Sequence, residues 1–167
     1  MSQLTVVPIE TPTLGDRSYL VHDGEVAFVV DPQRDIDRVL ALLDEHDVRL
    51  THVFETHIHN DYVTGGLALA QRCGATYVLN ADDPVRFERH GIRDGESIST
   101  GPLTVTAIHT PGHTPTHMSY AVAVDGTQLA VFTGGSMLFG AMGRTDLVDS
   151  DPFVSVAEQK LPNPCVG

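Results

Sequence analysis

Short apolar runs that alternate with a clear amphipathic helix restrict this chain of 167 residues to folds that layer helices on sheets. Val26–Val30 is a continuous run of β-branched and aromatic residues, which is typical of a buried strand. From Asp35 to Glu45 the apolar residues fall on one helical face, and Asp35 is a candidate N-cap. A further strand, Leu50–Phe54, leads into a histidine-rich segment. This order of elements predicts an α/β domain.

The rest of the chain adds strands more often than helices. We expect a helix over Val63–Arg72, a strand over Ala75–Leu79 and a short helix around Asp83–Arg89. Two early strands are expected at Leu4–Ile9 and Ser18–Val21. The second half is predicted to form the strands Ser97–Ser99, Leu103–Ile108, Met118–Val124 and Leu129–Phe132. No low-complexity segment divides the chain, so a single layered domain over 1–167 is expected.

The charge of the chain limits its partners. Asp and Glu number 22 against 10 Lys and Arg, which gives a formal net charge of −12, and the basic residues do not cluster. Phosphate backbones would repel such a surface, so we expect no nucleic-acid partner. No run reaches the roughly 20 apolar residues that span a bilayer, and no signal peptide is evident at the N-terminus. The prediction is a cytoplasmic protein without a membrane partner.

Histidines at alternating positions lie just beyond a predicted strand. Side chains two residues apart point to the same side of an extended chain, so His57 and His59 can converge on one ion, and Asp61 continues the series. Two imidazoles and a carboxylate suit Zn²⁺ or Fe²⁺. The segment 109–114 also follows a predicted strand, and its Pro-Gly pair forms a tight turn that would aim His113 inward.

The other histidines and the cysteines are interpreted as structural residues. A lone histidine is more often a surface or packed residue than a ligand, so no site role is assigned to His22, His46, His52 and His90. His109 and His117 flank the turn, where packing or support of a ligand is the preferred interpretation. Cys73 and Cys165 form no Cys-x-x-Cys pair, so any metal is expected to have nitrogen and oxygen ligands.

Four segments together resemble the metallo-β-lactamase superfamily. Thr56–Asp61 is similar to its Thr-His-x-His-x-Asp-His motif, and Thr110–Thr114 is similar to its second metal loop. Phe132–Gly135 stands where the family has Thr-Gly-Asp. Gly143–Asp146 resembles a Gly-Arg-Thr-Asp segment of the persulfide dioxygenase branch, which is related to glyoxalase II. The resemblance implies an αββα sandwich with the metal at one edge of the paired sheets.

The resemblance also implies roles for individual residues. His57, His59 and His113 match the three histidines of the first metal site. Asp61 matches the aspartate of the second metal site and is the candidate catalytic residue. Arg144 would bind the carboxylate of a glutathione-derived substrate through its guanidinium, although an ion pair with the nearby aspartate of its own segment is an equally good interpretation.

Two departures from the family predict a single divalent metal ion. Tyr62 stands at the position of the second-site histidine, and Gly135 stands at that of the aspartate that completes the site. The persulfide dioxygenase branch implies one Fe²⁺ held by two histidines and an aspartate, and Gly135 removes that carboxylate here. Three histidines and a water would equally form a Zn²⁺ site, so both metals stay open.

The C-terminal part of the fold is expected to be truncated. Members of this branch continue past the segment that Gly143–Asp146 resembles, whereas here a short tail ends in the Pro-rich stretch Leu161–Gly167. The second sheet would then have an exposed edge, which a homodimer would cover.

Three functions follow as hypotheses. The first is a persulfide dioxygenase that oxidises glutathione persulfide in sulfur metabolism, favoured by Gly143–Asp146 and by the loss of the second-site histidine. The second is a glyoxalase II-like zinc hydrolase of a thioester, favoured by the intact set of three histidines. The third is a degenerate metal-binding chain without activity, suggested by Gly135 and the short C-terminus.

Overall fold

The largest sheet has six strands in sequence order. The computed structural model describes residues 4–11, 16–59, 62–138 and 141–142. The first three strands pair antiparallel, and the third to the sixth pair parallel. The six strands are β1 (Thr5–Thr11), β2 (Asp16–His22), β3 (Val26–Val30), β4 (Arg49–Phe54), β5 (Thr76–Asn80) and β6 (His90–Ile92).

A second sheet is antiparallel, with the strand order β10-β9-β8-β7. Asp125 and Gly126 turn β9 into β10 with φ angles of 50° and 78°, the left-handed conformation that an Asp-Gly hairpin turn requires. A two-stranded hairpin of β11 and β12 follows. These strands are β7 (Ser97–Thr100), β8 (Leu103–His109), β9 (Met118–Val124), β10 (Thr127–Phe132), β11 (Met137–Leu138) and β12 (Ala141–Met142).

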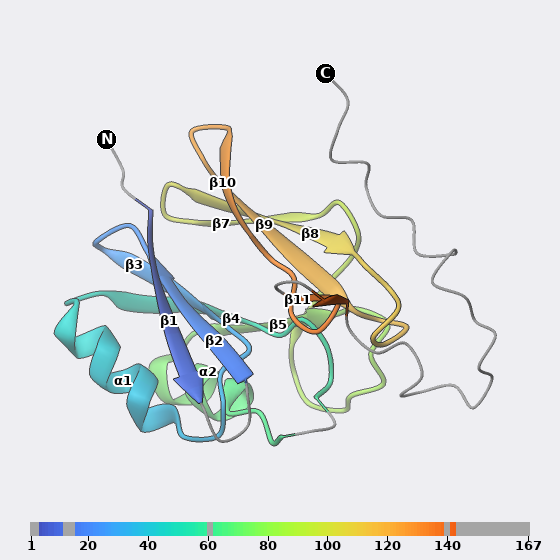
Figure 1. Ribbon diagram of the computed structural model, residues 1–167. Helices are drawn as coiled ribbons and strands as arrows, with labels where there is room; N and C mark the ends of the chain where they lie inside the picture. The colour runs from blue at the N-terminus through green and yellow to red at the C-terminus, as the bar shows by residue number, and fades with distance from the viewer. Residues whose placement is uncertain (1–3, 12–15, 60–61, 139–140, 143–167) are drawn as a thin grey trace.

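Helices and sheets form three layers (Figure 1). Helices α1 (Ile36–Glu45) and α2 (Gly66–Cys73) cover one face of the six-stranded sheet, and the second sheet covers the other face. One apolar cluster, which includes Val39 and Leu69, joins the helices to the first sheet. A second cluster, which includes Phe28 and Tyr120, fills the space between the sheets. Burial of both faces of the first sheet explains why its central strand β3 is wholly apolar.

The layered α/β fold predicted from the sequence is confirmed, and the expected strands agree closely with the observed ones. Within the described ranges both helices lie on the first sheet, so the second helical layer of the expected αββα sandwich is not among them. Asp35 occupies the N-cap position of α1, but its side chain makes no capping hydrogen bond. Neither described helix is long and apolar enough to cross a membrane.

The short helix expected around Asp83–Arg89 is wrong, because tertiary hydrogen bonds hold this segment in an irregular path. The Arg89 guanidinium donates to the carbonyl oxygens of Ala81 and Asp83, at 2.9 and 3.0 Å. The Asp83 carboxylate accepts from the hydroxyl of Thr116, which belongs to a distant loop. Strand β6, which follows this segment, was not predicted, and α2 starts at Gly66 rather than at Val63.

A buried histidine makes the stability of the fold sensitive to pH. His22, at the end of β2, is buried, and its ring centroid lies 4.8 Å from that of His46 at the C-terminus of α1. Neither ring nitrogen of His22 has a hydrogen-bond partner among the described residues. Burial, and then the charge of His46, lower the pKa of His22 below its usual 6.5, against a smaller opposing contribution from Asp23.

We therefore expect His22 to destabilise the fold in acid. The unfolded chain binds this proton more tightly, so the free energy of unfolding falls as the pH drops below 6.5, by up to about 1.4 kcal/mol per pH unit for one proton. The substitution His22→Gln should flatten this dependence between about pH 7 and about pH 5, as measured by urea unfolding. His90→Gln, at an exposed position on β6, is the control. An equal pH dependence in wild type and His22→Gln would contradict this prediction.

Candidate metal centre

The carboxyl ends of β3 and β4 form the floor of the candidate site. The two strands pair in parallel with Val30 beside Phe54, so the next residues along each strand, Asp31 and Glu55, lie side by side. The histidine-rich segment continues directly from Glu55. In sheets of this kind, ligand sites form where the carboxyl ends of neighbouring parallel strands meet.

Asp31 fixes the start of the histidine segment. One carboxylate oxygen accepts from the backbone N–H of Thr56 and the other from the Thr56 hydroxyl, each at 2.7 Å. The backbone N–H of Asp31 donates to the carbonyl of Phe54 at 2.9 Å, and its φ of 49° lies in the left-handed region. Asp31 is 5% exposed, so both hydrogen bonds to its carboxylate are shielded from water.

The position of Thr56 determines which nitrogen of His57 is free to bind a metal. The Thr56 hydroxyl donates its proton to Asp31, so it can only accept from Nδ1 of His57, 2.8 Å away. His57 therefore carries its proton on Nδ1 and presents the lone pair of Nε2. Burial, and then the charge of His59, lower the pKa of His57 to about 3. The ring is thus neutral at physiological pH, which is the form that ligates a metal.

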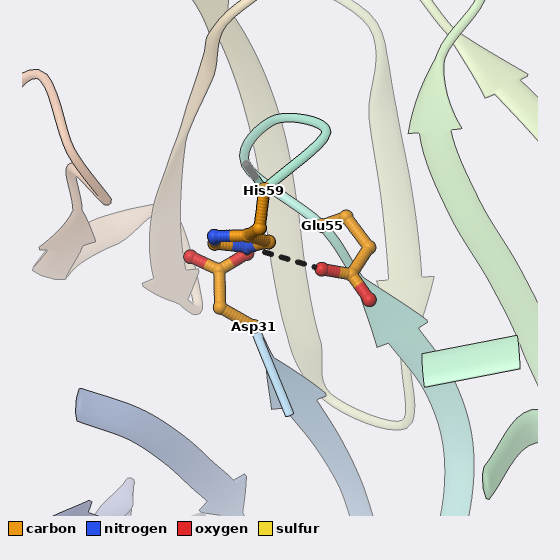
Figure 2. A group of neighbouring side chains, drawn as sticks. All are labelled: Asp31, Glu55 and His59. Atoms are coloured by element: carbon orange, nitrogen blue, oxygen red, sulfur yellow. Dashed lines mark ion pairs between the residues drawn. The ribbon is translucent and has the colours of Figure 1, made fainter. Parts of the chain in front are cut away.

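His59 contacts its neighbours through Nε2, whereas His57 does so through Nδ1. Its Nε2 lies 3.3 Å from Asp31, 3.4 Å from Glu55 and 3.0 Å from the hydroxyl of Tyr62. Figure 2 shows the imidazole beside the two carboxylates, which come from different strands. The two carboxylates lie within ion-pair distance of Nε2 and the Tyr62 hydroxyl within hydrogen-bond distance, so Nε2 carries a proton. Nδ1 of His59 is consequently the nitrogen that remains for a metal.

The two carboxylates also set the charge of this part of the site. Burial raises the pKa of Glu55 to about 7. For His59, burial alone would lower the pKa, but the contacts with Asp31 and Glu55 outweigh it and raise the pKa to about 10. His59 is therefore protonated without a metal, and a metal on Nδ1 would replace that proton. Among the described residues, Asp31, Glu55 and His59 form a group whose metal-ligating atoms all lie within 4.8 Å of one another.

The loop between β8 and β9 brings a third and a fourth histidine to the site. The ring centroid of His57 lies 4.0 Å from that of His59 and 4.6 Å from that of His113. His117 is fully buried and stacks on His57 with centroids 5.1 Å apart. The loop is fixed at Thr116, whose carbonyl accepts from the side-chain amide of Asn80 at 2.7 Å.

The segment after β10 closes the site with two glycines. Gly134 has a φ of 47° and lies so close to Thr56 that a Cβ there would collide with its side chain. A Cβ on Gly135 would lie 2.7 Å from Nε2 of His113, so no larger residue fits without displacing that ring. Gly135 therefore packs directly against the ring of His113.

The structure brings together the three histidines that the sequence singled out, with His117 as a supporting neighbour. Asp61 and Arg144 lie outside the described residues. Sequence reasoning missed Asp31 and Glu55. Each directly follows a buried apolar strand, and this placement was the available signal for a site at the sheet edge.

A family model described as "Metallo-beta-lactamase superfamily" matches residues 14–155 of this sequence. The chain belongs to the metallo-β-lactamase superfamily. It is 34% identical over 150 residues to a hydroxyacylglutathione hydrolase of Cereibacter sphaeroides, covering 86% of this chain and 56% of that protein. It is 32% identical over 161 residues to the cytoplasmic hydroxyacylglutathione hydrolase of Arabidopsis thaliana, covering 93% of this chain and 59% of the relative.

Two solved superfamily structures are similar along most of the chain. A metallo-β-lactamase of Staphylococcus aureus has a TM-score of 0.80 at 27% identity, covering 88% of this chain and 48% of that one. ETHE1 of Myxococcus xanthus has a TM-score of 0.76 at 33% identity, covering 85% of this chain and 62% of that one. The chain therefore spans only about half to three fifths of the length of these superfamily members.

The role of Asp31 yields a stability prediction for this superfamily member. Asp31→Asn leaves one of the buried Thr56 donors without its acceptor, so we expect the free energy of unfolding to fall by about 1–3 kcal/mol. Asp35→Asn is the matched control, since Asp35 is exposed and makes no side-chain cap. Urea unfolding of both variants measures the difference. Equal stability of Asp31→Asn and wild type would show that Asp31 does not anchor the segment.

Proposed function

We propose that this chain holds a single divalent metal ion and oxidises a glutathione-linked persulfide. The observation that carries the proposal is the placement of Tyr62. Its hydroxyl hydrogen-bonds to His59 and to the carbonyl of Asp31, at the position where the superfamily has a second-site histidine. Gly135 removes the other second-site ligand. Both changes favour one metal over two.

The proposed ligands are Nε2 of His57, Nδ1 of His59 and the His113 imidazole. The fit rests on the hydrogen bonds to Thr56, Asp31 and Glu55, which occupy the opposite nitrogens of the first two rings. A bound Fe²⁺ would supply redox chemistry toward dioxygen, whereas a bound Zn²⁺ would supply a water of lowered pKa.

Residues of the chain would position the substrate and move its proton. We propose that the Asp61 carboxylate acts as the catalytic base, because it belongs to the same alternating series as the two histidines. Arg144 is proposed to bind a carboxylate of the glutathione moiety. The resemblance of Gly143–Asp146 to the persulfide dioxygenase branch favours the persulfide substrate.

A second candidate is hydrolysis of a glutathione thioester at a zinc ion. The specific observation in its favour is that curated relatives at 32–35% identity are named hydroxyacylglutathione hydrolase. The intact set of three histidines suits either metal.

Metal content tests the ligand assignment. Wild-type protein purified without oxygen should carry about one ion per chain, and His57→Ala should lose nearly all of it, because Thr56 directs Nε2 of His57 into the site. Elemental analysis measures both. His90→Ala, at an exposed position on β6, is the control and should keep its metal. Full metal content in His57→Ala would overturn the assignment.

The reaction is tested by offering both substrates to the same preparation. We expect oxygen uptake with glutathione persulfide, together with iron in the protein. Zinc in the protein together with cleavage of a glutathione thioester would instead establish the second candidate. A folded, metal-loaded protein that turns over neither substrate would indicate a chain that binds metal without activity.

A further inference from the structure

Asp31 and Glu55 both approach His59, but their other contacts differ. Both oxygens of Asp31 accept hydrogen bonds from Thr56. Oε2 of Glu55 has no hydrogen-bond partner among the described residues, although the side chain is only 1% exposed. Its ion-pair contact is Nε2 of His59, at 3.4 Å. Burial of a carboxylate oxygen without a hydrogen bond costs free energy. We therefore attribute the position of Glu55 to its contact with His59.

Two neighbours hold Glu55 in this orientation. Oε1 accepts a short hydrogen bond from the hydroxyl of Thr64, whose oxygen in turn accepts from the backbone N–H of Gly66 at 2.9 Å. The first residue of α2, Gly66, has no side chain, and a Cβ there would collide with Oε1. The start of α2 therefore packs closely against the carboxylate of Glu55, and Oε2 is directed to His59 (Figure 2).

We infer that Glu55 is a positioning residue of the metal centre, which fixes the ring of His59 through Nε2–H. This inference rests on the proposed metal site, in which Nδ1 of His59 is a ligand. A carboxylate that accepts from the far nitrogen of a ligating imidazole orients the ring and raises its basicity. Asp31 shares this contact, but both of its carboxylate oxygens also accept from Thr56, one from the backbone N–H and one from the hydroxyl.

The orientation of His59 matters because a ligating imidazole that is already held in place binds a metal more tightly than one that must first be ordered. Glu55 contacts His59 from the side of Nε2, while Nδ1 is the proposed ligand atom. We therefore expect Glu55 to set the affinity of the metal site.

The test is the affinity of the full chain for Zn²⁺, measured by competition with a chromophoric chelator. Glu55→Gln keeps the size of the side chain and removes its charge, and we expect about 10–100-fold weaker binding. Glu55→Asp keeps the charge but withdraws it from His59, so its affinity should lie between those of Glu55→Gln and wild type. Substituting Co²⁺ and recording its absorption bands would show a changed ligand field in Glu55→Gln.

A matched variant separates positioning from simple loss of structure. His52→Gln alters a partly buried polar side chain on β4, where it hydrogen-bonds Thr100 at 3.0 Å. It should bind Zn²⁺ and give the Co²⁺ spectrum of wild type, even if its unfolding midpoint falls. An equal loss of affinity in His52→Gln and Glu55→Gln would overturn the inference.

Parallel measurement of His57→Ala distinguishes the two possible failures. If His57→Ala loses the metal and Glu55→Gln binds it as tightly as wild type, the metal site stands and the role of Glu55 is refuted. If His57→Ala binds normally while Glu55→Gln loses the metal, the ion sits among Asp31, Glu55 and His59 instead, and both proposals fail.

Discussion

The carboxylate of Asp31 is the constraint on which the rest of the site depends. It holds the backbone and hydroxyl of Thr56, and the hydroxyl of Thr56 then fixes the proton of His57 on Nδ1. The same carboxylate approaches Nε2 of His59. One buried side chain at the end of β3 thus determines which nitrogen each of two histidines turns toward the site. The second sheet is tied to the same segment, because Met118 N–H donates to the carbonyl of Thr56 at 2.7 Å.

The changes at the second metal position form a consistent set. Tyr62 places a hydroxyl within hydrogen-bond distance of His59, and Gly135 allows His113 to pack directly against the backbone. These two residues are the basis of the proposal that the site holds one metal ion instead of two.

Local patterns in the sequence predicted the fold and the three histidines, because strand and helix periodicity and the spacing of His57 and His59 are visible within a few residues. Asp31 and Glu55 could not be paired in the same way. Their contact depends on the register of β3 against β4, which sets Val30 beside Phe54 and is not encoded in either strand alone. The helix expected at Asp83–Arg89 does not form for a related reason, since the Asp83 carboxylate accepts a hydrogen bond from Thr116 in a distant loop.

A mononuclear site built from three histidines with fixed ring orientations is tested most directly by native mass spectrometry of the metal-loaded chain, combined with X-ray absorption at the metal edge. We expect one ion per chain, with ligand atoms that are mainly imidazole nitrogens. Two ions per chain, or ligand atoms that are mainly carboxylate oxygens, would contradict this site.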